Sequence, residues 1–155
     1  MQEKTVTARP VRIYCEHAAL TRRIKHLRRI GRIELIKFPY DPGSASRQIP
    51  GYATPSGAQI RDLNLPISDL PGMIADYSGS AHFGEILSIV GHQNRRDALH
   101  VDSAFKSGCL AFITRDSDIL DHKTRLEGIL GIRFFDPDTE PNDLEPFVAD
   151  NSGAY

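Results

Sequence analysis

No run of apolar residues in this 155-residue sequence approaches the length of a membrane-spanning helix. The basic and polar start of the chain, Met1–Arg12, also lacks the apolar segment of a secretory signal peptide. We therefore expect a protein that does not enter a membrane and that is located in the cytoplasm. The length fits one domain, which is large enough to bury an ordinary core without stabilising cross-links.

Cysteine is scarce, because the chain contains only Cys15 and Cys109. Each lies within an apolar run, so we expect two buried free thiols rather than a disulfide. Cys15 and His17 flank Glu16, but no second Cys/His pair follows at the spacing of a zinc site. The G-x-S-x-G sequence of many serine hydrolases is also missing, which removes support for that chemistry.

Charged residues are not scarce, but the positive and negative charges nearly cancel. The formal net charge of −1 identifies no partner, but the charges are unevenly distributed. Residues 1–47 carry 11 Lys and Arg against 4 Asp and Glu, whereas residues 136–155 carry 6 acidic and no basic residues. This asymmetry predicts an electropositive face and an acidic, flexible tail over residues 138–155.

The positive charge is concentrated in one predicted helix. No acidic residue occurs between Ala18 and Ile33, and the basic residues that fall near one helical face are Arg22, Lys25, Arg29 and Arg32. Such a run is often only a solvated face. An all-positive face, however, is raised in energy by its own repulsion, so we expect it to contact the backbone of a polyanion such as RNA.

Hydrophobic periodicity and turn residues predict alternating strands and helices. The expected strands are Val11–Cys15, Ile33–Phe38, Leu110–Thr114 and Ile132–Phe135. The expected helices are Ala18–Ile30, a broken pair within Ser68–Val90, Asp97–Ser107 and Ile119–Leu130. This order predicts an α/β fold, namely a three-layer α/β/α sandwich around a central, mostly parallel sheet of four or five strands. The domain would span residues 1–137, with a Pro/Gly-rich insertion at residues 39–72.

Acidic residues lie where two of these elements place ligands. Asp97 stands at the start of a helix, and Asp116 and Asp118 follow the next strand. Each can act as a helix cap or turn residue, which is the commoner role. A cap needs only one carboxylate, however, and three that converge at one edge of a parallel sheet repel each other unless a cation lies among them. Their oxygen ligands predict a site for Mg²⁺ or Mn²⁺.

The same stretch resembles a known family. Asp97-Ala98-Leu99-His100, followed by Phe112-Ile113-Thr114-Arg115-Asp116, resembles the second half of PIN domains, in which a D-x-L-H helix start precedes an apolar strand ending in T-x-D. The segment from Gly131 to Pro137 looks like the last strand of that family. The match covers residues 95–137 well and the rest only by the order of elements.

The resemblance implies the roles of particular residues. It places the third acid of a PIN site on Asp97, the fourth on Asp116 and an auxiliary acid on Asp118. The first acid falls on Glu16, which is one methylene longer than the usual Asp. The second acid has no clear counterpart, so Glu85 is the candidate and Glu34 the reserve. His100 lies one helical turn after Asp97 and can face the same site.

The function that the resemblance implies is metal-dependent hydrolysis of RNA. Glu16, Asp97, Asp116 and Asp118 would be catalytic metal ligands, joined by Glu85 as a further ligand. PIN domains occur in many bacterial toxins, so the expected partners are RNA, an antitoxin-like protein and a second copy of the chain. Two alternatives stay open: a degenerate PIN-like module that binds nucleic acid or protein without cleavage, and a receiver-type regulatory domain. The receiver reading is weaker because that fold needs an acidic pair after the first strand, where only Glu16 stands.

Overall fold

Four strands form a single parallel sheet. The computed structural model describes residues 9–36 and 79–152. In that part of the chain the strands are β1 (Val11–Cys15), β2 (Ile33–Ile36), β3 (Ala111–Ile113) and β4 (Arg133–Phe135). They lie in the order β2-β1-β3-β4, and every neighbouring pair is parallel. The α/β class and the parallel sheet are thus confirmed. The insertion at residues 39–72 and the first part of the expected helical pair lie outside the described residues.

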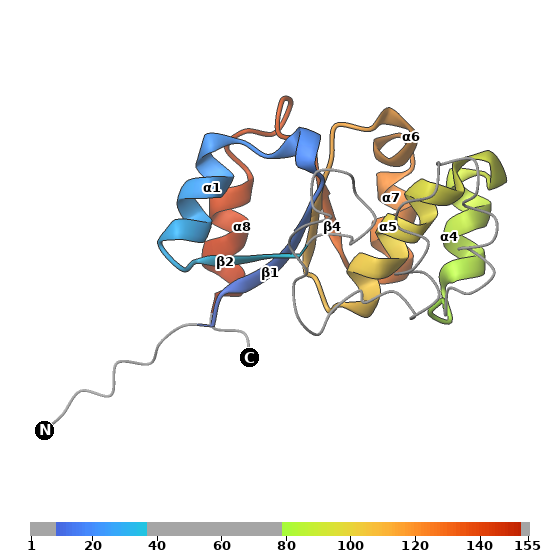
Figure 1. The fold of residues 1–155 in the computed structure, drawn as a ribbon, viewed down its shortest axis with the longest axis horizontal. Coiled ribbons are helices and arrows are strands. Elements are labelled where there is room, and N and C mark those ends of the chain that lie inside the picture. The colour runs from blue at the N-terminus through green and yellow to red at the C-terminus, as the bar shows by residue number, and fades with distance from the viewer. Residues whose placement is uncertain (1–8, 37–78, 153–155) are drawn as a thin grey trace, which may run out of the picture.

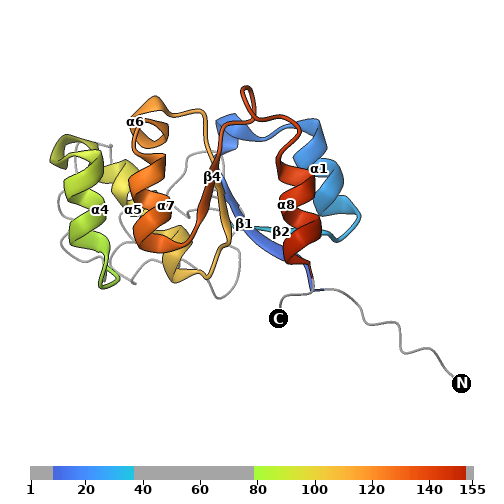
Figure 2. The same cartoon turned by 180° about the vertical axis from the view of Figure 1, so that it is seen from behind.

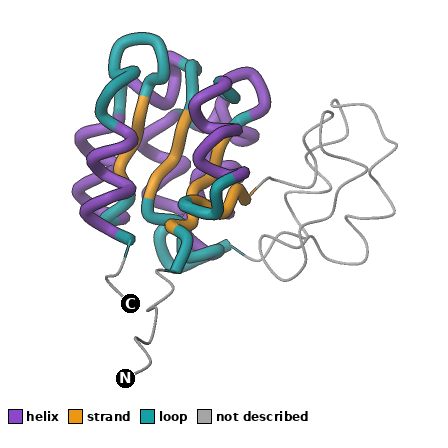
Figure 3. Tube along the Cα trace, turned by 90° about the vertical axis from the view of Figure 1, so that its left-hand side faces the viewer, coloured by secondary structure: helices purple, strands orange, loops and turns teal. Residues whose placement is uncertain are grey.

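Helices cover both faces of the sheet. Figures 1 and 2 show α1 (Arg22–Arg29) and α8 (Leu144–Asn151) on one face, and α4 (Phe83–Val90), α5 (Arg95–Lys106) and α7 (Lys123–Leu130) on the other. A short helix, α6 (Ser117–Leu120), and two 3-10 turns, η1 (His17–Ala19) and η4 (His92–Asn94), complete the described elements. None of the described helices is long and apolar enough to cross a membrane. Figure 3 shows the strands side by side, with helices beside them.

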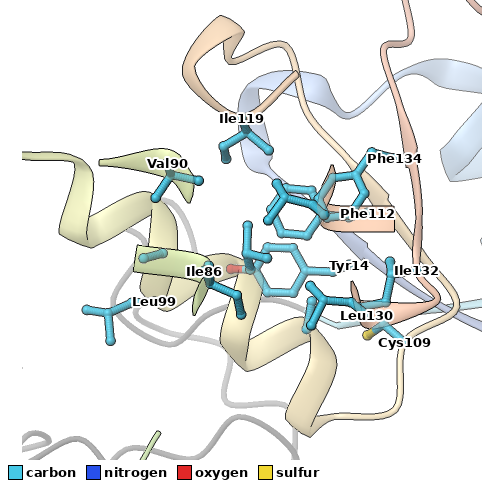
Figure 4. Close-up of a cluster of buried hydrophobic side chains, with 14 of the residues drawn as sticks. Tyr14, Ile86, Val90, Leu99, Cys109, Phe112, Ile119, Leu130, Ile132 and Phe134 are labelled. Atoms are coloured by element: carbon cyan, nitrogen blue, oxygen red, sulfur yellow. The ribbon is translucent and has the colours of Figure 1, made fainter. Parts of the chain in front are cut away.

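The central strands β1 and β3 are almost entirely apolar, as expected of strands with both faces covered, and Arg12 is the exception. All residues of β3 are buried, as are Val11, Ile13, Tyr14 and Cys15 of β1. Side chains therefore alternate between two separate clusters. Tyr14 and Phe112 point towards α5, where their rings stack with centroids 4.9 Å apart (Figure 4). Ile13, Cys15, Ala111 and Ile113 point towards α1 and α8. Cys15 and Cys109 are buried free thiols, as predicted.

The helix expected over Ala18–Ile30 is divided into η1 and α1, and α1 begins after Thr21. The Thr21 hydroxyl accepts a hydrogen bond from the Ile24 amide at 3.3 Å, which caps α1. Ile24 and Leu27 are the buried residues of the helix, and they pack on the sheet. Gly31 follows with a φ of 76°, a left-handed conformation that glycine adopts without steric cost. The chain then turns directly into β2.

The prediction of a flexible tail over residues 138–155 is wrong for most of that segment. Residues 144–151 form α8, whose Leu144 and Val148 are buried against the sheet, while Phe147 contacts Phe135 at a centroid distance of 5.3 Å. The sequence analysis missed this helix because the segment around it is acidic and contains Pro141 and Pro146. The described part of the domain therefore extends to residue 152.

The acidic residues of this segment also pair with basic residues from the rest of the chain. The ion pairs are Arg115–Asp138, Lys123–Glu140 and Arg23–Glu145, at 2.9, 2.6 and 2.8 Å. Exposed pairs of this kind contribute about 0–1 kcal/mol each, so the buried apolar side chains supply most of the attachment. The uneven charge of the sequence is thus partly neutralised within the fold.

The position of α8 predicts that its buried face contributes to stability. Val148→Ala should lower the free energy of unfolding by roughly 1–3 kcal/mol, because Val148 is 1% exposed and its removed methyl groups leave a cavity. The exposed Asp150 lies on the same helix, and Asp150→Ala should change stability by less than about 0.5 kcal/mol. Denaturant unfolding measures both. A flexible tail would leave the two variants equally stable.

Candidate metal centre

The pairing of β1 with β3 brings the two acidic loops together. Cys15 is opposite Ile113 in the parallel register, and the Glu16 amide donates a hydrogen bond to the Ile113 carbonyl at 3.1 Å. Both strands end here, so Glu16 and the residues after Ile113 leave the sheet at the same edge. The carboxyl edge of a parallel sheet is where α/β proteins place their ligands.

Three aspartates meet at this edge. Asp97, Asp116 and Asp118 each offer one carboxylate oxygen, and these oxygens all lie within 4.8 Å of one another. Asp97 comes from the first turn of α5, Asp116 from the end of the loop after β3, and Asp118 from the first turn of α6. Oxygens at this separation can reach one cation, because carboxylates bind Mg²⁺ or Ca²⁺ at about 2.0–2.6 Å. The predicted convergence of these three residues is therefore confirmed.

Glu16 is linked to the cluster through Thr114. The Thr114 hydroxyl donates to Glu16 Oε2 at 3.0 Å, and it accepts a hydrogen bond from the Asp116 amide at 2.9 Å. Thr114 is fully buried, so this single side chain fixes both acidic loops. Glu16 lines the same pocket as Asp97 and Asp116, but it is not a member of the 4.8 Å cluster.

The helix caps differ from the sequence-based expectation, and the difference matters for function. Asp116, and not Asp118, caps the next helix, because Asp116 Oδ1 accepts from the Asp118 amide at 2.9 Å. The expected helix over residues 119–130 is split into α6 and α7. Helix α5 begins two residues before Asp97, and its N-cap residue is Asn94. Among the described residues, the Asp97 side chain makes no capping hydrogen bond, so Asp97 does not serve as a helix cap there.

The cluster is electrostatically unfavourable without a cation. The pKa of Asp97 is raised to about 7, first by burial, and then by the charge of Asp116, a side-chain hydrogen bond with Asp116 and the charge of Asp118. Arg96 acts in the opposite direction. A cation among the carboxylates would reverse this effect, because it favours their charged form. The donor set therefore fits a hard divalent cation.

A pocket of about 330 Å³ opens beside the carboxylates. The residues that line it are Glu16, His17, Ala18, Arg96, Asp97, His100 and Asp116. His100 is 5% exposed, and its Nδ1 lies 2.6 Å from the hydroxyl of Tyr14, a buried residue of β1. His100 thus faces the site, as the sequence suggested, but it is held by the core.

Neither candidate for the second acid reaches this pocket. Glu85 lies on α4 with a side chain 60% exposed, and its nearest ionic partner is His82 Nδ1 at 3.8 Å. Glu34 lies on β2, where it pairs with Arg12 Nε at 3.3 Å. The expectation that Glu85 joins the metal ligands is therefore wrong for the described structure. Helical register alone could not say which face of α4 would turn towards α5.

The basic residues expected to bind RNA lie on the surface of α1 and just beyond it. Arg22, Lys25, Arg29 and Arg32 are all exposed, and among the described residues none of them forms an ion pair. Arg23 is different, because it contacts Glu145, Asn142 and the Pro141 carbonyl. Its role is to attach α1 to the segment before α8.

Three contributors were not identified from the sequence. Thr114 lies inside the T-x-D pattern, but nothing in the sequence shows that its hydroxyl would join two loops. Tyr14 resembles any core aromatic of a buried strand. Arg96 precedes Asp97 directly, and the available signal was its position: basic residues are unfavourable in the first turn of a helix.

Comparisons of the chain with models of protein families, with curated proteins and with solved structures found no match.

The raised pKa of Asp97 predicts how the stability of the metal-free protein changes with pH. Between about pH 4 and pH 7, folded Asp97 holds a proton that the unfolded chain, with a pKa near 3.8, has lost. The contribution of this group to the free energy of unfolding therefore falls as pH rises through that window. Asp97→Asn removes the contribution, so the variant should lose less stability than the parent between pH 5 and pH 8. Denaturant unfolding with a chelator present measures the difference.

Asp121→Asn is the matched control, because Asp121 is exposed at the end of α6 and lies outside the cluster. It should follow the pH dependence of the parent. If the parent and Asp97→Asn instead lost equal stability between the two pH values, the three carboxylates would not be interacting.

Proposed function

We propose that this protein is a PIN-like ribonuclease that hydrolyses RNA phosphodiester bonds with Mg²⁺ or Mn²⁺. The observation that carries the proposal is the convergence of three aspartate carboxylates at the carboxyl edge of a parallel sheet, next to a pocket that Glu16 also lines. The helices on both faces of the sheet are compatible with the three-layer fold of that family.

Asp97, Asp116 and Asp118 would hold the cation, and Glu16 would act at the pocket wall, directly or through water. When bound, the cation supplies an activated water and stabilises charge on the phosphate. The chain's own contribution is to hold the ligands rigidly. Asp97 lies in a helix, Asp116 is fixed by its hydrogen bond to the Asp118 amide, and Glu16 is fixed by buried Thr114. Rigid ligand placement is what fixes the coordination of a metal site.

The position and charge of helix α1 favour RNA as the proposed substrate. It follows η1 directly, and η1 residues His17 and Ala18 line the pocket. The exposed basic residues begin at Arg22, just after this turn, and continue along the helix, where Arg22 and Arg29 are about 10 Å apart along the axis. A single strand that enters the pocket can therefore place its neighbouring phosphates beside these side chains. Such contacts hold the backbone without reading sequence.

A substitution at one proposed metal ligand can test catalysis without disrupting the fold. Asp116→Asn keeps an oxygen that can cap α6, so the fold should persist. Cleavage of a single-stranded RNA in Mn²⁺ should fall by at least about a hundredfold, since even outer partners of metal sites are worth ten- to a hundredfold. Mn²⁺ at about 100 times its dissociation constant should stabilise the parent by about 2.7 kcal/mol and the variant by much less.

Asp121→Asn again serves as the control, and it should cleave RNA and respond to Mn²⁺ as the parent does. Stability of the parent that does not change with Mn²⁺, together with no detectable cleavage, would exclude the ribonuclease. That result would favour a PIN-like module that binds its partner without catalysis.

The α1 surface can be tested with a pair of charge-matched variants. Lys25→Gln/Arg29→Gln removes two exposed charges of α1, and it should weaken RNA binding for all sequences alike. The slope of log affinity against log salt should fall by about 1.4, or about 0.7 per lost contact with a single strand. Fluorescence anisotropy with an RNA oligonucleotide over a salt series measures this.

The matched control is Lys106→Gln/Arg125→Gln, which makes the same change in net charge at exposed positions of α5 and α7. If both double variants weakened binding equally, only the net charge of the protein would matter, and α1 would be an ordinary solvated helix.

A further inference from the structure

We propose that Arg96 is the residue that binds and positions the substrate phosphate in this pocket. The inference rests on the proposed function, since it concerns the anion that would occupy the same site. It assigns to one side chain of this chain a role that the acidic cluster cannot fill.

The first indication is that Arg95 and Arg96 occupy the first turn of α5. Cations are disfavoured at this end of a helix, because the unpaired amides there already carry partial positive charge. The two arginines differ in their surroundings. Arg95 is exposed, whereas Arg96 is half-buried and lines the pocket together with Asp97 and His100. A locally unfavourable residue at a site wall suggests a role in function rather than in helix stability.

The second indication is that the charge of Arg96 has no ion-pair partner in the described residues. Arg96 lines the pocket next to Asp97. Within residues 9–36 and 79–152, however, its guanidinium forms no hydrogen bond and no ion pair within 4.0 Å. A half-buried guanidinium usually makes such bonds, and its planar donors match two oxygens of a phosphate. Arg96 thus lies beside the acidic residues without forming an ion pair with any of the described ones.

The third indication is the charge balance of the pocket. Glu16, Asp97, Asp116 and Asp118 together carry four negative charges when ionised, and one divalent cation neutralises two of them. A phosphodiester would still approach a negative site. Arg96 lowers that remaining charge and gives the phosphate a fixed partner on the wall of the pocket, so it would attract and orient the anion.

The test compares Arg96→Gln with Arg95→Gln, a control that removes the same charge from the neighbouring exposed position. Cleavage of a short single-stranded RNA is measured at saturating Mn²⁺, with the Mn²⁺ affinity of each variant determined separately. Arg96→Gln should lower kcat/KM by about ten- to a hundredfold, mainly by raising KM. Arg96→Lys should recover part of the loss, because it keeps the charge but not the two-pronged geometry. Arg95→Gln should stay within about twofold of the parent.

A second measurement uses inorganic phosphate and the Mn²⁺-loaded protein in titration calorimetry. Phosphate should bind the parent and Arg95→Gln alike, and Arg96→Gln at least tenfold more weakly. Phosphate binding that depends on Arg96 in a protein that cleaves no RNA would support Arg96 and refute the ribonuclease.

Two results would overturn the inference. They are equal behaviour of the two variants in both measurements, and a parent that neither binds phosphate nor cleaves RNA. In the first case with an active parent, the proposed function stands without Arg96.

Discussion

The parallel pairing of β1 with β3 is the constraint on which the site depends. These two strands are the buried centre of the sheet, and their register places Cys15 opposite Ile113. Because both strands run in the same direction, Glu16 and the segment from Thr114 to Asp118 emerge at the same edge. A shift of one residue in this register would turn every side chain of β3 to the other face and would move Thr114 away from Glu16. The alternation of Tyr14 and Phe112 with Ile13 and Ile113 between two apolar clusters prevents that shift.

Next to this apolar core, buried polar side chains hold the residues of the site in place. The buried hydroxyl of Thr114 donates to Glu16 and accepts from the Asp116 amide. The register of the two strands therefore determines how these two acidic residues lie relative to each other. Tyr14 does the same for α5, since its hydroxyl reaches His100 one helical turn after Asp97. Buried hydrogen bonds of this kind are costly to leave unsatisfied, and they therefore specify one arrangement. Thr114 and Tyr14 thus connect residues that line the pocket to the two central strands. From the sequence, both look like ordinary core residues.

Sequence reasoning succeeded where the signal was local and periodic. The apolar runs of β1 and β3 and the order of strands and helices predicted the α/β class and the edge of the sheet at which Asp97, Asp116 and Asp118 meet. It failed where the outcome depends on contacts between distant segments. The acidic composition of residues 138–155 hid α8, whose burial requires the sheet face that Leu144 and Val148 cover. Likewise, nothing near Glu85 in the sequence shows that its side chain turns to solvent instead of towards α5.

Helix capping alone does not explain the placement of the acids. One carboxylate, that of Asp116, is sufficient to cap α6, and the N-cap residue of α5 is Asn94 rather than Asp97. Asp97 nevertheless stands half-buried beside two other acids, where burial and their charges raise its pKa to about 7. A folded chain gains nothing from this repulsion in the absence of a ligand, and any neutral residue at position 97 would relieve it. Asp97 lies in α5, Asp118 lies in α6, and Asp116 is held by its hydrogen bond from the Asp118 amide, so the fold itself keeps these carboxylates close together. Binding of a cation would offset this local cost, because it would stabilise all three carboxylates at once.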